Sequence, residues 1–490
     1  MLLTIDYDPS VLQALEAAFP TPPKRAKQQL DKYLVMLQRE MRLSLMHRTE
    51  YARKLKAFNV RLTTLTNKSP TIGNREFRVH EWLNLNGFSL VKNINKNANN
   101  IFKETAILRP TSLLMVKHEN LLDEMKSLTE HELTDYLNTF TSEWSLIVND
   151  YLSEFNALSK QEQQRLYFTS EVDIDSLKNY MRRIVRGQSG LLRVNEENSL
   201  AQAENILRIA QVSNGYLPQK IDKKAFGRTY YEGVSVVSVS KELRMAFLGD
   251  SWEYDCRSCS TAWKMGFADD WHQLKKKRRQ SVREKFSAMT LYLENKDEFF
   301  RQVIKHVFIH PSQKDHKLIV KQAMTALGFG AKLSLGKWKG LNGEERQTSL
   351  FEVFEEDRED LARFVNCELV QKFNKEQHTL NKYIVDKFSS DAQWQKDMDA
   401  ERQRKKLTKS FSEAQKVVWL FQHAETWMMD LVRKELKKMK KTVLANVHDA
   451  IFIRQRLSAL ELSKIEMRVR ATTNIDYFAL GEIFHSRYNQ

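Results

Sequence analysis

The sequence has few of the residues that cross-link chains, interrupt helices or span membranes. Its 490 residues include three cysteines, 15 glycines and eight prolines. Three cysteines cannot build a disulfide framework, which favours a reducing compartment. Scarce glycine and proline argue against an all-β sandwich and favour long helices. Since no run of about 18 apolar residues occurs, we expect no transmembrane helix and no membrane partner.

Two local patterns narrow the class further. The first ten residues, MLLTIDYDPS, lack a basic region followed by an apolar one, so we expect no secretory signal peptide and an intracellular, cytoplasmic protein. Cys256 and Cys259 form a C-x-x-C pair, which is half of a zinc site. No second pair at zinc spacing lies nearby, which favours ordinary small residues over metal ligands.

The charge balance is strongly positive. Lysine and arginine number 78 against 62 aspartates and glutamates, a net charge of +16. A surplus of this size suits a polyanion, because neutralising phosphates releases counterions and drives binding. The alternative is a soluble protein that happens to be basic. With 42% hydrophobic residues the chain has ample material for a core, and its length predicts two to four structural units.

Helical periodicity dominates the first part of the chain. Apolar residues recur at three and four over 24–58 and 119–155, and we expect residues 1–215 to be helical throughout. The pattern then changes. The alternation VSVVSVS at 234–240 predicts an extended segment that continues into a short strand at 252–255.

The second half predicts helices around a small sheet. Helices are expected over 262–307, 317–327 and 357–441. Two apolar runs around His448-Asp449 predict a β-hairpin over 442–455 with this pair at its tip. A further strand is expected at 465–472. The fold class is therefore α+β and mostly helical, with a small antiparallel sheet inside a helical body.

Two aspartates are placed where nucleotidyl transfer needs them. Asp255 ends the short strand, and Asp449 lies at the hairpin tip. Rigid strands would hold both within reach of two Mg2+ ions, or Mn2+, which prefer carboxylate oxygens and stabilise the attacking and leaving oxygens. The alternative is that each is an ordinary turn aspartate.

A stripe of four side chains and a glycine lies between the aspartates. Lys317, Lys321, Thr325 and Phe329 follow one another at steps of four, and Gly330 comes next. Steps of four put side chains on one helical face. Two lysines, a hydroxyl and an aromatic ring suit a triphosphate and a base, with the glycine ending the helix. The alternative is an amphipathic surface helix.

In this order, Asp255, the stripe at 317–330 and His448-Asp449 resemble motifs A, B and C of the family A DNA polymerases and the phage-type single-subunit RNA polymerases. The resemblance implies a right-hand polymerase. Its palm would be a small antiparallel sheet on which Asp255 and Asp449 are the catalytic metal ligands. Lys321 would contact the incoming triphosphate, and Phe329 would lie against the nucleotide and the template base.

The resemblance also implies a division of the chain. The expected regions are 1–215 for a helical N-terminal region with a thumb, 216–270 for the first part of the palm, 271–356 for helical fingers, and 357–490 for the second part of the palm and the C-terminal segment. Nothing in the first region resembles the acidic trio of a 3′–5′ exonuclease. Proofreading is therefore not expected.

Segments around the motifs resemble nucleic-acid contacts of the family. The run 227–229 and the run 241–247 resemble the lead-in to motif A of family A DNA polymerases, where an arginine contacts the template–primer duplex. Gln422 resembles a glutamine that reads the minor-groove side of the new pair, although His423 stands where glycine is usual. The expected contacts to template and primer are Arg228, Arg244, Gln422 and His448.

Two departures from the family bear on the substrate. Ser260, an expected nucleotide contact, stands where family A DNA polymerases carry a glutamate that crowds the ribose 2′-hydroxyl. Lys317 replaces an arginine and loses its bidentate phosphate contact. We therefore expect a template-directed polymerase using nucleoside triphosphates, with DNA synthesis favoured by the lead-in. The alternatives are an RNA polymerase or primase-like enzyme, a non-catalytic nucleic-acid-binding replication accessory protein, and a helical scaffold.

Overall fold

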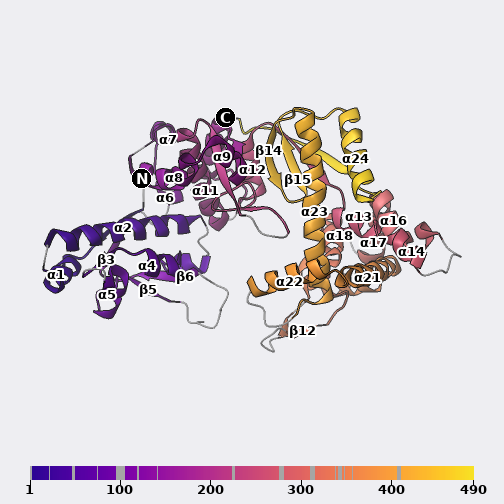
Figure 1. The fold of residues 1–490 in the computed structure, drawn as a ribbon, viewed down its shortest axis with the longest axis horizontal. Helices are drawn as coiled ribbons and strands as arrows, with labels where there is room; N and C mark the ends of the chain where they lie inside the picture. The colour runs from indigo at the N-terminus through magenta and orange to yellow at the C-terminus, as the bar shows by residue number, and fades with distance from the viewer. Residues whose placement is uncertain are drawn as a thin grey trace. The chain divides into compact units, whose positions relative to one another are not determined.

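The chain forms two compact units. In this computed structural model the described residues are all except 1–2, 21–22, 47–49, 74–75, 95–104, 118–120, 141, 192, 223–226, 275–280, 310–314, 337, 340–344, 347, 356, 405–409 and 490. The first unit comprises 1–221, 231–251 and 485–490, and the second comprises 222–230 and 252–484 (Figure 1). Both are mostly helical with small antiparallel sheets, and no described helix is long and apolar enough to cross a membrane.

The first unit combines helices with several short strands. Its helices are α1 (Pro9–Ala18), α2 (Pro23–Leu45), α3 (Glu50–Lys54), α4 (Leu62–Lys68), α5 (Val79–Leu85), α6 (Leu121–Lys126), α7 (Glu130–Asn138), α8 (Ser142–Ala157), α9 (Lys160–Leu166), α10 (Ile174–Val185), α11 (Arg193–Val212) and α12 (Lys241–Leu248). The strands up to residue 231 are β1 (Thr4–Tyr7), β2 (Phe58–Arg61), β3 (Thr71–Ile72), β4 (Phe77–Arg78), β5 (Val91–Asn93), β6 (Thr105–Pro110), β7 (Leu114–Lys117), β8 (Tyr167–Glu171), β9 (Tyr216–Asp222) and β10 (Tyr230–Tyr231).

The expectation of helix throughout 1–215 is wrong in part, because β1 to β8 lie within that range. The long helix α2 has the expected period: Leu30, Leu37 and Met41 are buried along one face. The strands escape the helical pattern because they are two to six residues long. Strands this short are decided by partners far along the chain, as where Phe58 pairs with Leu108 across β2 and β6.

The expectation of an extended segment at 234–240 is also wrong, because this stretch is a series of turns before α12. Its serines bond locally: Ser235 N donates to Ser238 Oγ at 2.8 Å. Val236 N donates a hydrogen bond to Gln219 Oε1 at 2.7 Å. Serine hydroxyls compete with strand pairing in this way, so an apolar–serine alternation does not specify a strand.

The second unit combines many helices with a four-stranded sheet and a short two-stranded one. Its helices are α13 (Cys259–Met265), α14 (Ala268–Leu274), α15 (Val282–Lys285), α16 (Ser287–Glu294), α17 (Lys296–Val307), α18 (His316–Gly328), α19 (Ser349–Val353), α20 (Arg358–Asn366), α21 (Glu368–Ser389), α22 (Ala392–Arg404), α23 (Glu413–Lys438) and α24 (Ala459–Thr473). Its strands are β11 (Ser251–Cys256), β12 (Trp338–Lys339), β13 (Glu345–Arg346), β14 (Val443–Val447), β15 (Ala450–Ile453) and β16 (Leu480–His485).

The main sheet has the strand order β14-β15-β11-β16. The predicted hairpin is confirmed: β14 and β15 pair antiparallel, with Val447 opposite Ala450 and His448-Asp449 as the turn. The predicted short strand is confirmed as β11, which pairs antiparallel with β15. Figure 1 shows α23 and α24 beside this sheet, and the two helices pack on each other. The helices expected at 317–327 and over most of 357–441 are confirmed as α18 and α20 to α23.

The strand expected at 465–472 is wrong, because these residues belong to α24. Ser458 and Glu461 form a capping box that starts the helix. Ile465 and Val469, four residues apart, are fully buried on one face. The β-branched residues therefore read as a strand in isolation, whereas the cap and the spacing of four specify a helix.

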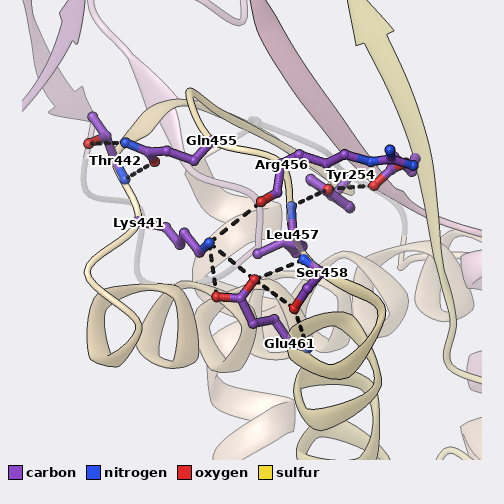
Figure 2. Close-up of polar contacts among 9 residues, drawn as sticks. Tyr254, Lys441, Thr442, Gln455, Arg456, Leu457, Ser458 and Glu461 are labelled. Carbon is purple, nitrogen blue, oxygen red and sulfur yellow. Dashed lines mark hydrogen bonds and ion pairs between the residues drawn. The ribbon is translucent and has the colours of Figure 1, made fainter.

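A network of polar contacts fixes the base of the hairpin, opposite its tip (Figure 2). Lys441 Nζ lies 2.9 Å from a carboxylate oxygen of Glu461. The hydroxyl of Tyr254, on β11, donates to Glu482 Oε2 at 2.7 Å and accepts from Leu457 N at 2.8 Å. Because Tyr254 is fully buried and precedes Asp255 directly, these bonds fix the backbone that carries the aspartate.

Candidate active site

Strand pairing brings the two predicted aspartates together. Asp255 lies opposite Ala450 in the β11–β15 register, and Cys256 N donates to the carbonyl oxygen of Asp449 at 2.8 Å. Asp255 is the last residue but one of β11, and Asp449 directly precedes β15, so the two lie next to each other at the same end of these paired strands. His448 allows the tight turn by adopting a φ of 52°, a conformation that histidine tolerates better than most residues.

Both aspartates line a cavity of about 730 Å3 within the second unit. β16 forms one side, and a Cβ placed on Gly481 would lie 2.8 Å from Asp255 Oδ1. Only glycine therefore leaves room for the carboxylate in this position. Ser260, at the start of α13, also lines the cavity.

Helix α18 contributes much of the predicted stripe to the same cavity. Lys321, Thr325 and Phe329 all line it. Thr325 Oγ1 donates back to the carbonyl of Lys321 at 2.8 Å. The ring of Phe329 is 40% exposed, and its centroid lies 5.9 Å from that of Phe421. A cation, a hydroxyl and an exposed aromatic face thus share one wall.

Lys317 and Gly330, the first and last residues of the stripe, do not line this cavity. Lys317 is well exposed, pairs with Asp297 at 2.8 Å and lines a separate hollow of about 420 Å3. Gly330 ends α18 with a φ of 90°, and a Cβ there would lie 2.7 Å from the Cβ of Ala414. The glycine is therefore required by both its backbone conformation and its close approach to α23.

A lysine that no motif indicated completes the basic side of the cavity. Lys296, the first residue of α17, donates from Nζ to Ser258 Oγ at 2.9 Å. Ser258 has a φ of 49°, so a non-glycine residue holds a left-handed conformation next to the site. Arg257 lines the cavity as well. Nothing in the local sequence marks Lys296, because its role depends on where α17 packs.

Charges across the cavity influence one another. Burial lowers the pKa of Lys296 and the nearby charge of Lys321 adds to this, whereas Asp255 opposes it. Burial raises the pKa of Asp449; its own backbone N–H and Arg228 oppose the rise, and Glu253 adds to it. Burial therefore disfavours the charged forms of Asp449 and Lys296.

Arg228 is paired with a buried acid that the sequence did not single out. Its Nη2 donates to Glu425 Oε1 at 2.9 Å, and Nε contacts Oε2 of the same carboxylate. Glu425, on α23, is 1% exposed and lines the cavity. Burial raises the pKa of Glu425, against the lowering effect of Arg228. The pair fastens residues 227–230 to α23, and Thr426 Oγ1 adds a bond of 3.1 Å to the carbonyl of Gly227.

The other expected nucleic-acid contacts are dispersed. Gln422, on α23, lies beside Gly227. Its Oε1 would be 3.8 Å from a Cβ added to that glycine. The His448 ring meets Tyr230 edge-on with centroids 5.6 Å apart. Arg244 belongs to the first unit, where its guanidinium bonds the carbonyls of Val236 and Val239. Its observed role is to hold the turn before α12.

A fully buried lysine joins three helices behind the cavity. Lys264 Nζ donates to the carbonyl oxygen of Gly328 at 2.9 Å and to Gln377 Oε1 at 2.7 Å. It thereby ties α13, which follows Asp255, to the end of α18 and to α21. Burial lowers the pKa of Lys264 to about 7. Sequence reasoning missed Lys264, because a lysine is rarely expected in a core.

Two carboxylates on paired strands suit a hard cation, which takes oxygen ligands and keeps several waters. Among the described residues, no group of three or more histidine, cysteine, aspartate or glutamate side chains is arranged to hold a metal ion. Ions at Asp255 and Asp449 would therefore take most of their ligands from water and substrate. Cys256 and Cys259 are both buried thiols, and their contact with each other raises the pKa of Cys259.

Comparison with known proteins adds no functional assignment. No protein-family model matches the sequence, and no curated protein matches it. The geometry of the cavity in the second unit is therefore the basis on which a function can be inferred.

Proposed function

We propose that the chain is a template-directed nucleic-acid polymerase that extends a strand from nucleoside triphosphates, with DNA as the favoured product. One observation carries the proposal. The pairing of β11 with β15 puts Asp255 and Asp449 at one edge of a cavity whose other sides present Lys321 and Lys296. Carboxylates for cations beside ammonium groups for phosphates are what phosphoryl transfer requires of a protein.

Asp255 and Asp449 would hold two Mg2+ ions, which Mn2+ could replace. Such ions would supply stabilisation of negative charge on the attacking 3′-oxygen and the leaving pyrophosphate. The chain's own contribution is to keep both carboxylates at a fixed spacing and partly removed from water. The Cys256–Asp449 backbone bond and the buried Tyr254 hydroxyl support this.

The basic side of the cavity suits a triphosphate. Lys321 and Lys296 present ammonium groups, and Phe329 offers a half-exposed ring for a base. In this proposal Lys296 takes the part that the spacing of the stripe assigned to Lys317, which is turned to Asp297. Residues 227–230, held by Glu425, would contact the template–primer duplex.

The choice of sugar depends on the residue at position 260. Ser260 lines the cavity and carries no carboxylate to crowd a 2′-hydroxyl. We therefore expect weak discrimination between deoxynucleotides and ribonucleotides. An RNA polymerase or primase-like enzyme is the alternative outcome, and proofreading is not part of the proposal.

Incorporation assays test the proposal. The full chain is offered dNTPs and NTPs separately, on DNA and on RNA templates, with and without a primer, in Mg2+. We expect Asp255→Asn and Asp449→Asn to reduce incorporation by about a thousandfold or more, because each removes a metal-binding charge. Asp269→Asn, an exposed aspartate on α14, is the matched control. Incorporation that survives Asp449→Asn contradicts the mechanism, whereas nucleic-acid binding without incorporation under any condition favours the accessory protein.

A further inference from the structure

The first unit contains a hollow rich in hydrogen-bond donors. It has a volume of about 570 Å3 and lies at the end of α10. The residues with donor side chains that line it are Thr134, Asn179, Arg182, Arg183, Arg186, Gln188 and Asn489. Three of the seven are arginines from the C-terminal end of α10 and its cap, and all three line the same space.

Arg182 is held in place before any ligand arrives. Its side chain is only 11% exposed. Its Nη1 donates to Asn179 Oδ1 at 2.9 Å, and its Nη2 lies 3.4 Å from Thr134 Oγ1. A guanidinium held in this way has less conformational freedom to lose on binding.

The last residues of the chain frame the hollow. Asn179 Nδ2 donates to the carbonyl of Tyr488 at 3.0 Å, and Tyr488 N donates to Ser176 Oγ at 3.0 Å. The guanidinium of Arg183 lies over the Tyr488 ring, 5.3 Å from its centroid. The tail therefore orients Arg183 without neutralising it.

One carboxylate reaches into this cluster. Glu130 lies 2.7 Å from Arg186 Nη2 and 3.8 Å from Arg182 Nε. It is the one acidic residue among the described residues that line the hollow, against three arginines. An excess of two positive charges remains, and Glu130 occupies a place that an oxygen of an anionic ligand would take.

We propose that this hollow is a binding site for phosphate groups. Arginine forks, amides and a hydroxyl match the several oxygens of a phosphate, which accepts hydrogen bonds and donates few. The volume exceeds that of a single phosphate, so the ligand is a larger phosphorylated molecule or a nucleic-acid backbone. The site is separate from the aspartate cavity and does not depend on the proposed polymerase activity.

Matched charge variants of the full chain test the site. Binding of inorganic pyrophosphate is measured by calorimetry in EDTA, and binding of a fluorescent single-stranded DNA by anisotropy. We expect Arg183→Gln with Arg186→Gln to weaken binding of at least one probe by about tenfold or more, since each arginine makes charge-assisted bonds. The control, Lys160→Gln with Arg165→Gln on α9, removes the same charge from exposed positions of the same unit. It should weaken binding by less than about threefold through general electrostatics.

Glu130→Gln gives a test of opposite sign. Removing the internal carboxylate frees Arg186 and Arg182 for the ligand, so affinity should rise by about threefold or more. A change in the affinity for pyrophosphate assigns the site to free phosphorylated compounds. A change in the affinity for DNA alone assigns it to a nucleic-acid backbone. Equal loss in the two double variants, weaker binding in Glu130→Gln, or no binding of either probe by the wild type overturns the proposal. In the last case the arginines serve only to offset the negative end of the α10 helix dipole.

Discussion

Lys264 donates a hydrogen bond to the carbonyl oxygen of Gly328 from a position that water does not reach. Its second acceptor is Gln377 Oε1. A neutral amine has two N–H groups, which suffice for both acceptors. The lysine can therefore remain bonded to α18 and α21 without its charge.

This arrangement predicts a pH-dependent stability. In the unfolded chain a lysine keeps its proton up to about pH 10.4, whereas burial lowers the pKa of folded Lys264 to about 7. Between these values the unfolded state binds more protons, so this lysine's contribution to stability rises with pH and is flat below about pH 7. Relative to Lys264→Met, the wild type should gain about 1.4 kcal/mol per pH unit between pH 7.5 and 9.5. Urea unfolding at several pH values measures the difference, and a constant difference would show that the amine stays charged.

The hydroxyl of Tyr254 should be needed for stability more than for packing. Tyr254→Phe keeps the ring but leaves Leu457 N without its acceptor and removes a donor from Glu482 (Figure 2). We expect a loss of about 1–3 kcal/mol in the free energy of unfolding, the usual effect of leaving a buried group unpaired. Tyr216→Phe, at an exposed tyrosine, should change it by less than about 0.5 kcal/mol. Equal effects of the two substitutions would contradict the role of the network.

The Arg228–Glu425 pair should show strong coupling. Glu425→Met leaves a largely buried guanidinium without its carboxylate, and we expect a loss of about 2–4 kcal/mol in the free energy of unfolding. Adding Arg228→Met removes the unpaired charge and should restore part of that loss, because an apolar pair avoids desolvation. Urea unfolding of the wild type, both single variants and the double variant gives the coupling. Additive losses would mean that the ion pair contributes nothing of its own.

Gly481→Ala should impair the candidate active site selectively. The new Cβ would lie 2.8 Å from Asp255 Oδ1, which forces the carboxylate to move. We expect incorporation to fall by about a hundredfold, because a displacement of about 1 Å in a catalytic site lowers the rate by about that factor. A control, Gly336→Ala, adds a Cβ whose nearest neighbour is Ser334 Oγ at 4.0 Å. Unfolding by urea distinguishes the proposed effect from general destabilisation. If Gly481→Ala lowers stability and incorporation together, the result contradicts a selective effect on the site.

The two lysines near the cavity should differ in their effect on nucleotide use. Lys296→Met removes an ammonium that lines the cavity, so KM for the nucleotide should rise by about tenfold or more. Lys317→Met removes an exposed lysine paired with Asp297, and KM should change by less than about threefold. Steady-state kinetics of incorporation measure both. A larger rise in KM for Lys317→Met than for Lys296→Met would show that Lys317, not Lys296, contacts the triphosphate.

The sequence was most informative where local pattern and tertiary structure agree. The hairpin around His448-Asp449 and the face of α18 with Lys321 could be read directly, because two apolar runs and a step of four each specify one local geometry. The strand expected at 465–472 failed since β-branched residues also fit a helix with a good cap. Lys296 and Glu425 could not be found, because their positions depend on how α17 and α23 pack, which no local spacing encodes.

The backbone bond between Cys256 and Asp449 has a mechanical consequence. Because it joins the two strands at the residues that carry or adjoin the aspartates, bending of the hairpin carries β11 with it. The spacing between the two carboxylates is therefore set by strand pairing, whereas Lys296 and Lys321 are placed by the separate helices α17 and α18.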